Sequence, residues 1–273
     1  MMKYGQNYLL VGIAALFVSG TGCVAVEFED SLDVISQADD VENGLPNNGL
    51  PNNGLPNNGL PNNGLASTAI ESEWDAWLND PTDIGGMTLG ARNNILMKYI
   101  VRCALPGGTS SSFKDSGGTL HTWYGEIGVA PNWSTGALTS TEQRWVSSCV
   151  TSLVNADATS VIVSQRGEND SPYVMMPDEA TNYPVTEGAY FGNMFADPPV
   201  YYACNNGAYT TERLPGRRCT LAAGNCSPIT LTSSCQSICQ SEPRTVDSVP
   251  FTVYHDCTVD SVTYPEVTTI FVP

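Results

Sequence analysis

Cysteine is the residue type with the most evident chemistry in this chain, because cysteine sulfur atoms form disulfides or bind metals. The 273 residues include nine cysteines: Cys23, Cys103, Cys149, Cys204, Cys219, Cys226, Cys235, Cys239 and Cys257. Six of the nine lie between Cys204 and Cys257, a density that is typical of exported domains held together by disulfides. An odd number leaves one cysteine over, and that cysteine needs a separate role.

The pair Cys235-x-x-x-Cys239, with His255 further along the chain, has the residue types of a zinc site. Structural zinc sites are more often built from closer C-x-x-C pairs, and disulfides are the usual form of cysteine in exported proteins. We therefore expect disulfides here, and neither a metal nor a cofactor. The sequence does not choose among the pairings of the six C-terminal cysteines.

The chain has two histidines, His121 and His255, and a serine hydrolase with a Ser-His-Asp triad would have to use one of them. The sequence has no G-x-S-x-G motif. Odd spacing along a predicted strand points His121 and Glu126 to opposite faces, and it also separates His255 from its neighbour Asp256. We expect a structural role for both histidines and assign no catalytic residue. An envelope hydrolase that uses His121 or His255 is the alternative.

Three arginines, Arg213, Arg217 and Arg218, lie in the turn-rich stretch TERLPGRRC. Guanidinium groups bind carboxylates and phosphates with two parallel hydrogen bonds, so this loop could bind an anionic group of a surface polymer. The other interpretation is a solvated loop whose charges balance nearby acids.

The formal net charge of -17 is concentrated near the N-terminus. Before Arg92 there are 12 acidic residues and a single basic one, Lys3, whereas the rest of the chain has 16 acidic and 10 basic residues. Nucleic-acid binding needs clustered basic residues to neutralise phosphates, so this distribution excludes a nucleic-acid partner.

Residues 1–22 have the pattern of an export signal. Lys3 precedes an apolar run of 11 residues from Tyr8 to Val18, which is too short to span the hydrocarbon core of a membrane. The run ends at Gly20-Thr21-Gly22-Cys23. This ending resembles the lipobox of bacterial lipoproteins, although Gly20 stands where a Leu-like residue is commonest.

The resemblance implies a lipid on Cys23, which would anchor the chain to a membrane. The absence of Asp after Cys23 implies the outer membrane as the destination. The alternative is ordinary secretion, with cleavage after Gly20 or after Ala25. Lipidation of Cys23 and cleavage after Ala25 would each leave eight cysteines for disulfides, which is an even number.

Residues 23–67 are predicted to form an acidic, disordered tether. They contain four consecutive copies of Asn-Gly-Leu-Pro-Asn between 43 and 62. Proline prevents this repeat from forming hairpin ladders, and Asn stands where a β-helix of pentapeptide repeats needs a small apolar residue. Only leucine is available for burial, so the repeat cannot offset the entropy of folding.

Residues 68–273 are predicted to form the folded domain. Helices are expected from Thr68 to about residue 79, over 89–105 and after the capping box Thr139-x-x-Glu142. Cys103 and Cys149 fall on the buried sides of the second and third helices, so we expect them to pair. The stretch from 107 to 118 reads as a loop, followed by strands at 121–129 and 160–167 and in the four later β-rich segments.

These patterns predict an α+β fold, with two or three N-terminal helices packed on a mostly antiparallel sheet. The C-terminal region is expected to be a disulfide-rich arrangement of strands and loops, with a Cys-rich subdomain over 200–273. The expected function is that of an envelope-anchored lipoprotein whose domain binds a cell-surface protein or polymer.

Overall fold

The computed structural model describes residues 40–42, 68–83, 86–155, 162–206 and 228–273. The chain divides into two compact units, residues 1–33 and 34–273, and all described residues belong to the second unit. The expected signal peptide and the Asn-Gly-Leu-Pro-Asn repeat lie outside the described residues. Among the described residues, no helix is long and apolar enough to cross a membrane.

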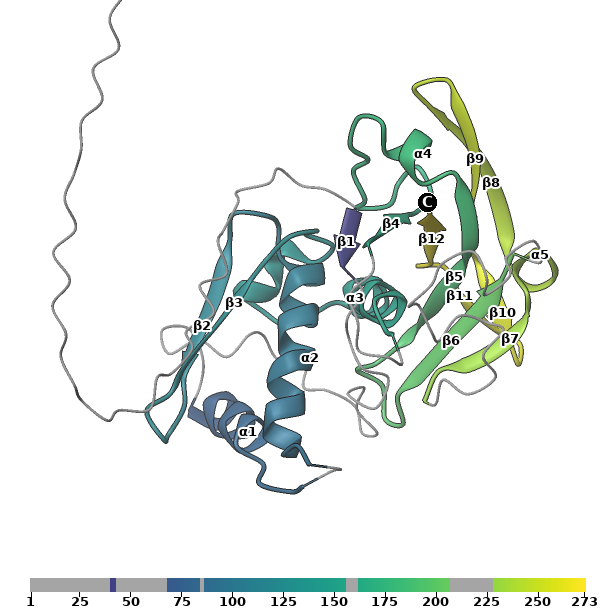
Figure 1. Ribbon diagram of the computed structural model, residues 1–273. Coiled ribbons are helices and arrows are strands. Elements are labelled where there is room, and N and C mark those ends of the chain that lie inside the picture. The colour runs from purple at the N-terminus through teal and green to yellow at the C-terminus, as the bar shows by residue number, and fades with distance from the viewer. Residues whose placement is uncertain (1–39, 43–67, 84–85, 156–161, 207–227) are drawn as a thin grey trace, which may run out of the picture. The chain divides into compact units, whose positions relative to one another are not determined.

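A six-stranded sheet carries the core of the second unit (Figure 1), and the α+β fold class expected from the sequence is confirmed. Neighbouring strands are antiparallel except for the last pair, which is parallel. The strands, in their order across the sheet, are β1 (Asp40–Glu42), β4 (Ile162–Arg166), β12 (Thr268–Val272), β5 (Val185–Asn193), β6 (Val200–Asn205) and β7 (Thr230–Ser234).

Three helices pack together with one face of this sheet in the largest buried cluster. They are α1 (Thr68–Leu78), α2 (Leu89–Ala104) and α3 (Ser140–Ser152), close to the boundaries expected from the sequence. The Thr139 side chain accepts a hydrogen bond from the Glu142 backbone N–H, and the Glu142 carboxylate accepts one in return. This confirms the expected capping box, which satisfies backbone donors at the start of α3. A 3-10 helix, η2 (Pro131–Ser134), precedes α3.

The other face of the sheet is covered by two hairpins and two short helices. Side chains along β5 point alternately to the two faces of the sheet. Tyr190 belongs to the buried cluster on the side of the helices, and Phe191 belongs to the cluster beneath the hairpins. A sheet buried on both faces explains why aromatic residues are consecutive there. The covering elements are α4 (Glu179–Asn182), α5 (Cys235–Ile238), β8 (Gln240–Val246) with β9 (Val249–His255), and β10 (Cys257–Val259) with β11 (Val262–Tyr264).

Strand β1 differs from the expectation that all of 23–67 is an unpaired tether. Asp40, Val41 and Glu42 pair with Ser164, Val163 and Ile162 of β4. Without β1, strand β4 would be the edge of the sheet and would leave unpaired backbone groups, which readily accept an added strand. The rest of the predicted tether lies outside the described residues.

The expectation of a loop over 107–118 is wrong for its middle part. Ser110–Lys114 form β2, which pairs with β3 (Leu120–Tyr124) in a separate hairpin. Phe113 is buried under this hairpin, and that burial outweighs the weak strand preference of serine. Strand β3 also ends earlier than expected. A Cβ atom at Gly125 would lie 2.6 Å from the carbonyl oxygen of Pro106, so the chain passes here too closely for any side chain.

Candidate functional site

The Cys103–Cys149 disulfide joins α2 to α3, as expected from the helical spacing. Both cysteines are fully buried, in the cluster that also contains the residues of the sheet facing the helices. The Gln165 side chain donates a hydrogen bond to the Cys149 carbonyl oxygen at 3.1 Å, which ties this disulfide to β4. The bridge is therefore a structural staple at the interface between the helices and the sheet.

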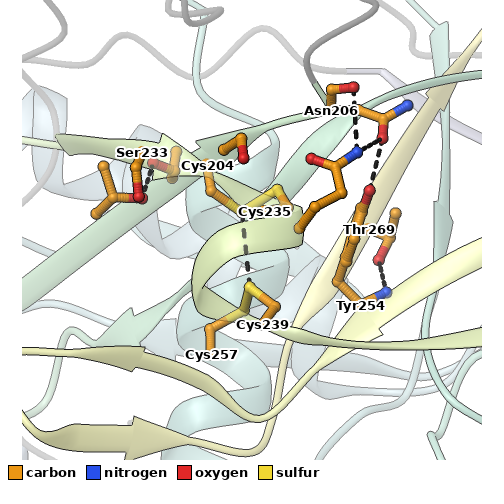
Figure 2. The surroundings of a disulfide bond; sticks show 12 residues. Cys204, Asn206, Ser233, Cys235, Cys239, Tyr254, Cys257 and Thr269 are labelled. Atoms are coloured by element: carbon orange, nitrogen blue, oxygen red, sulfur yellow. Dashed lines mark hydrogen bonds between the residues drawn. A yellow bond between two sulfur atoms is a disulfide. The ribbon is translucent and has the colours of Figure 1, made fainter.

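The C-terminal cysteines form a more unusual arrangement around α5 (Figure 2). Helix α5 is a single turn with Cys235 at its start and Cys239 just past its end. Cys235 is bonded to Cys204 of β6, and Cys239 is bonded to Cys257 of β10. Two disulfides therefore hold one helical turn between the central sheet and a hairpin. We call these four residues the cysteine cluster.

Hydrogen bonds support the same turn beside the cysteine cluster (Figure 2). The Gln236 side-chain amide donates to the Asn206 side-chain oxygen at 2.7 Å and to the Asn206 carbonyl oxygen at 3.3 Å. The Tyr254 hydroxyl donates to the same Asn206 side-chain oxygen at 2.5 Å. Burial raises the pKa of Tyr254, so this hydroxyl keeps its proton at neutral pH. Gln236 of α5 and Tyr254 of β9 thus meet at Asn206, directly after β6, so hydrogen bonds as well as disulfides hold α5 in place.

Cysteine sulfurs also form the one group of potential metal-ligating atoms that converge within the described ranges. The Sγ atoms of Cys204, Cys239 and Cys257 lie within 4.8 Å of one another. Metals bind thiolates, whereas each of these sulfurs is already in a disulfide. In the oxidised protein the cysteine cluster is consequently a pair of covalent links.

His121 is paired with Asp115, a partner that the sequence analysis missed because it did not recognise β2. The imidazole Nε2 lies 3.0 Å from the Asp115 carboxylate, and the ring stacks near Trp123 with centroids 5.8 Å apart. Asp115 also accepts a hydrogen bond from the Thr119 backbone N–H at 2.7 Å. In the described part of the chain, no hydroxyl or thiol hydrogen-bonds to His121. This geometry orients the ring and closes the hairpin turn.

The hydrogen bond from His121 lowers the pKa of the Asp115 carboxyl below its ordinary value of 3.8, and the Thr119 N–H acts in the same direction. A lowered pKa in the folded state stabilises the protein above the ordinary pKa, and this contribution is lost as pH falls through the folded-state value. We expect Asp115→Asn to be less stable than the wild type near neutral pH. The difference should shrink between about pH 5 and about pH 2 in urea-denaturation midpoints. A difference that stays constant over that range would exclude the Asp115 charge as its source.

The expectation that His255 and Asp256 point apart is wrong. His255 Nδ1 lies 3.0 Å from the Asp256 carboxylate and 3.7 Å from the Glu168 carboxylate. Asp256 has a φ of 45°, between β9 and β10, so the alternation of a regular strand is broken at this residue. Partial burial raises the pKa of Glu168, with the His255 charge opposing it and the charges of Asp256 and two further acids, Glu242 and Asp170, adding to it.

Arg166 is a buried cation that the sequence did not indicate. It is 1% exposed, and it donates hydrogen bonds to the Ser164 hydroxyl and to the carbonyl oxygens of Glu179 and Tyr183 at 2.8–3.0 Å. Its guanidinium carbon lies 3.9 Å from the ring centroid of Phe271 and 4.7 Å from that of Phe251. These contacts join β4 to α4, β9 and β12. The role is structural, because the group is closed off from solvent.

The outer face of the β2–β3 hairpin carries the largest exposed apolar side chains of that hairpin. Leu120 is 66% exposed and Tyr124 is 52% exposed, with Thr122 between them on the same face. Across the hairpin, Ser112 contacts Thr122 through their hydroxyls at 3.0 Å. The surface combines apolar groups with hydroxyls, a mixture suited to contact with a protein or a polymer.

The remaining residues singled out from the sequence lie outside the described residues. They are Cys23, the arginines Arg213, Arg217 and Arg218, and the cysteines Cys219 and Cys226. The anion-binding loop, the lipidation site and the fourth disulfide stay predictions.

Comparison with known proteins adds one match. The family described as the GLTT repeat matches residues 41–66, in six copies. These residues cover the Asn-Gly-Leu-Pro-Asn repeat and the end of β1, and they are a small part of the chain. No curated protein and no solved structure matches.

Proposed function

We propose that this protein is a lipoprotein of the cell envelope, anchored in the outer membrane by a lipid on Cys23. Its disulfide-stabilised domain binds a cell-surface protein or polymer. The anchor would place the domain at the envelope. A domain tethered there meets a partner on the same surface at a raised effective concentration, which favours binding.

The complete pairing of the six described cysteines carries this proposal. They form three disulfides, Cys103–Cys149, Cys204–Cys235 and Cys239–Cys257, and disulfides persist in oxidising compartments outside the cytoplasm. A bond between Cys219 and Cys226 would leave Cys23 as the odd cysteine. An odd cysteine directly after an export signal is the residue that a lipoprotein uses for its lipid.

The pairing of β1 with β4 changes the expected length of the tether. The anchoring segment then runs from Cys23 to Asp40, whereas the Asn-Gly-Leu-Pro-Asn repeat joins β1 to α1 and has both ends on the domain. A chain spans at most ~3.3–3.6 Å per residue, so about 17 residues reach at most ~56–61 Å, compared with ~149–162 Å for the roughly 45 residues up to Thr68. The attachment at β1 would therefore hold the domain nearer to the membrane surface than an attachment at Thr68.

The outer face of the β2–β3 hairpin is the surface that best supports contact with a partner. More than half of the surface of Leu120 and of Tyr124 is exposed to solvent, and hydroxyl groups beside them can hydrogen-bond to a polymer. The inner face of this hairpin packs on the core through Phe113 and Trp123, whereas Leu120 and Tyr124 on the opposite face are exposed.

Cys23→Ala tests the anchor directly. We expect the wild-type protein to fractionate with membranes and to enter the detergent phase, because a lipid chain partitions into apolar surroundings. The variant should move to the aqueous fraction with its domain still folded, since Cys23 is outside the domain. Fractionation followed by immunoblotting measures the shift, and near-ultraviolet circular dichroism serves as the folding control.

Mass spectrometry of the mature, non-reduced wild-type protein completes this test. An N-terminal Cys23 that carries lipid supports the proposal. An unmodified Cys23, or a mature chain that begins at Thr21 or Val26, would show ordinary export and contradict it.

A further inference from the structure

The two disulfides of the cysteine cluster touch each other. The Cys204 and Cys239 sulfurs are 3.8 Å apart, the contact marked by the dashed line between them in Figure 2. Each sulfur is already bonded to another sulfur and carries no hydrogen, so the contact is a van der Waals one. Cys235 begins α5 and Cys239 directly follows its last residue, so the turn brings Cys239 close to Cys235 and to Cys204, which is bonded to Cys235.

This contact matters for disulfide exchange. Exchange occurs when a thiolate attacks one sulfur of a disulfide and displaces the other. A thiolate on Cys239 would already lie in contact with Cys204, one half of the neighbouring disulfide. The usual obstacle, bringing the two sulfurs together, is absent within the cysteine cluster.

Only one of the four residues of the cysteine cluster, Cys239, is exposed to solvent. Cys204, Cys235 and Cys257 are 0% exposed, whereas Cys239 is partly exposed. Buried disulfides are protected from external thiols, because the rate of attack depends on access and on which sulfur is reached. Reduction should therefore begin at the Cys239–Cys257 bond, with the attack on Cys239.

Helix α5 would keep its position after that bond opens. Gln236 still donates two hydrogen bonds to Asn206, and Cys235 still links the start of the turn to β6. The Cys239 backbone N–H also donates to the Cys235 carbonyl oxygen at 2.8 Å, which closes the turn. A freed Cys239 thiolate would consequently remain beside Cys204.

We propose that the two disulfides react with an external dithiol as a single unit, and that reduction ends with a new Cys204–Cys239 bond. A thiolate of the dithiol attacks Cys239 and displaces Cys257, which takes a proton. The second thiol of the reagent displaces Cys239 as a thiolate and leaves the reagent as a disulfide. The Cys239 thiolate then attacks Cys204 and displaces Cys235, which takes the second proton.

In sum, one dithiol is oxidised and the protein gains two electrons and two protons, which appear as thiols on Cys235 and Cys257. Strand β6 remains bonded to α5, now through the far end of the turn. Strand β10, in contrast, loses its covalent link. Reduction that begins at the accessible Cys239 thus ends with thiols on the buried Cys235 and Cys257. The β10–β11 hairpin is then no longer covalently linked to Cys239.

The test uses the full-length oxidised protein and a substoichiometric amount of dithiothreitol. The reaction is quenched with acid, free thiols are alkylated with N-ethylmaleimide, and the disulfides are mapped by mass spectrometry of non-reduced peptides. We expect alkylation on Cys235 and Cys257, together with peptides joined through Cys204 and Cys239. The Cys103–Cys149 bond should stay intact as an internal reference.

Alkylated Cys239 and Cys257 beside an intact Cys204–Cys235 bond would overturn the proposal, because the first bond would have opened without exchange. Alkylated Cys204 and Cys235 beside an intact Cys239–Cys257 bond would overturn it as well. A Cys204→Ala/Cys235→Ala variant is the matched control. It lacks the second disulfide, so its labels should appear on Cys239 and Cys257; labels elsewhere would show that Cys239–Cys257 is not the accessible bond.

Discussion

Arg166→Ala is expected to lower the free energy of unfolding by about 3 kcal/mol or more. The guanidinium is 1% exposed, lies against the rings of Phe251 and Phe271 and donates to three acceptors. Alanine would leave a cavity beside the two rings and would take a donor from the carbonyl oxygens of Glu179 and Tyr183. A cavity and unsatisfied buried acceptors are two of the mechanisms that make single substitutions severe.

Two further variants at this position separate the contributions. Arg166→Met fills much of the space but donates no hydrogen bonds, so it should recover only the part of the loss that comes from the cavity. Arg166→Lys keeps the charge but lacks the planar fork, and it should recover little.

Arg244→Ala is the matched control for Arg166. Arg244 is only partly buried, lies 6.0 Å from the Phe251 ring centroid and donates to the Gly167 carbonyl oxygen at 2.6 Å. Its removal should cost about 1 kcal/mol. Urea denaturation followed by tryptophan fluorescence measures both variants. Equal losses for Arg166→Ala and Arg244→Ala would contradict a special role for the buried cation.

Removal of the staple between the helices should have a comparable effect. Cys103 and Cys149 are separated by 46 positions, and the chain-entropy treatment of a loop of that length gives a stabilisation of about 4 kcal/mol. Cys103→Ala/Cys149→Ala should lose about that amount in urea denaturation without a reducing agent. The double substitution avoids a free thiol that could exchange with other disulfides.

Cys239→Ala/Cys257→Ala provides the comparison, because its loop spans 18 positions and the same treatment gives about 3 kcal/mol. The ranking of the two variants tests the loop-length argument. A Cys103→Ala/Cys149→Ala protein as stable as the wild type would show that helix packing alone holds α2 against α3.

The helices could be predicted from the sequence because their signals are local. Thr139 and Glu142 are three residues apart, and the reciprocal hydrogen bonds between them depend only on the chain near them. The pairing of Cys103 with Cys149 was also predictable, since each residue falls on the apolar side of its own helix. Helix periodicity therefore determined both the elements and the contact between them.

The strands were less predictable where burial, not composition, decided the structure. Ser110–Lys114 reads as a polar loop, yet Phe113 and Trp123 are buried on the inner side of the β2–β3 hairpin. The missed strand also hid the Asp115–His121 pair, because the two residues meet only when the hairpin closes. At His255, a single residue with positive φ, Asp256, broke the alternation on which the expectation rested.

By itself, the sequence determined the α+β class, the helical elements and the Cys103–Cys149 bond, whereas the exported, anchored chain stays a prediction. These depend on local patterns: residue spacing, capping, composition and the number of cysteines. The tertiary structure alone decided the Cys204–Cys235 and Cys239–Cys257 pairings and the burial of Arg166 against two aromatic rings. The physical reason is that these contacts join residues distant in the chain, and their partners become neighbours only when β6, α5 and β10, or β4, β9 and β12, come together in the fold.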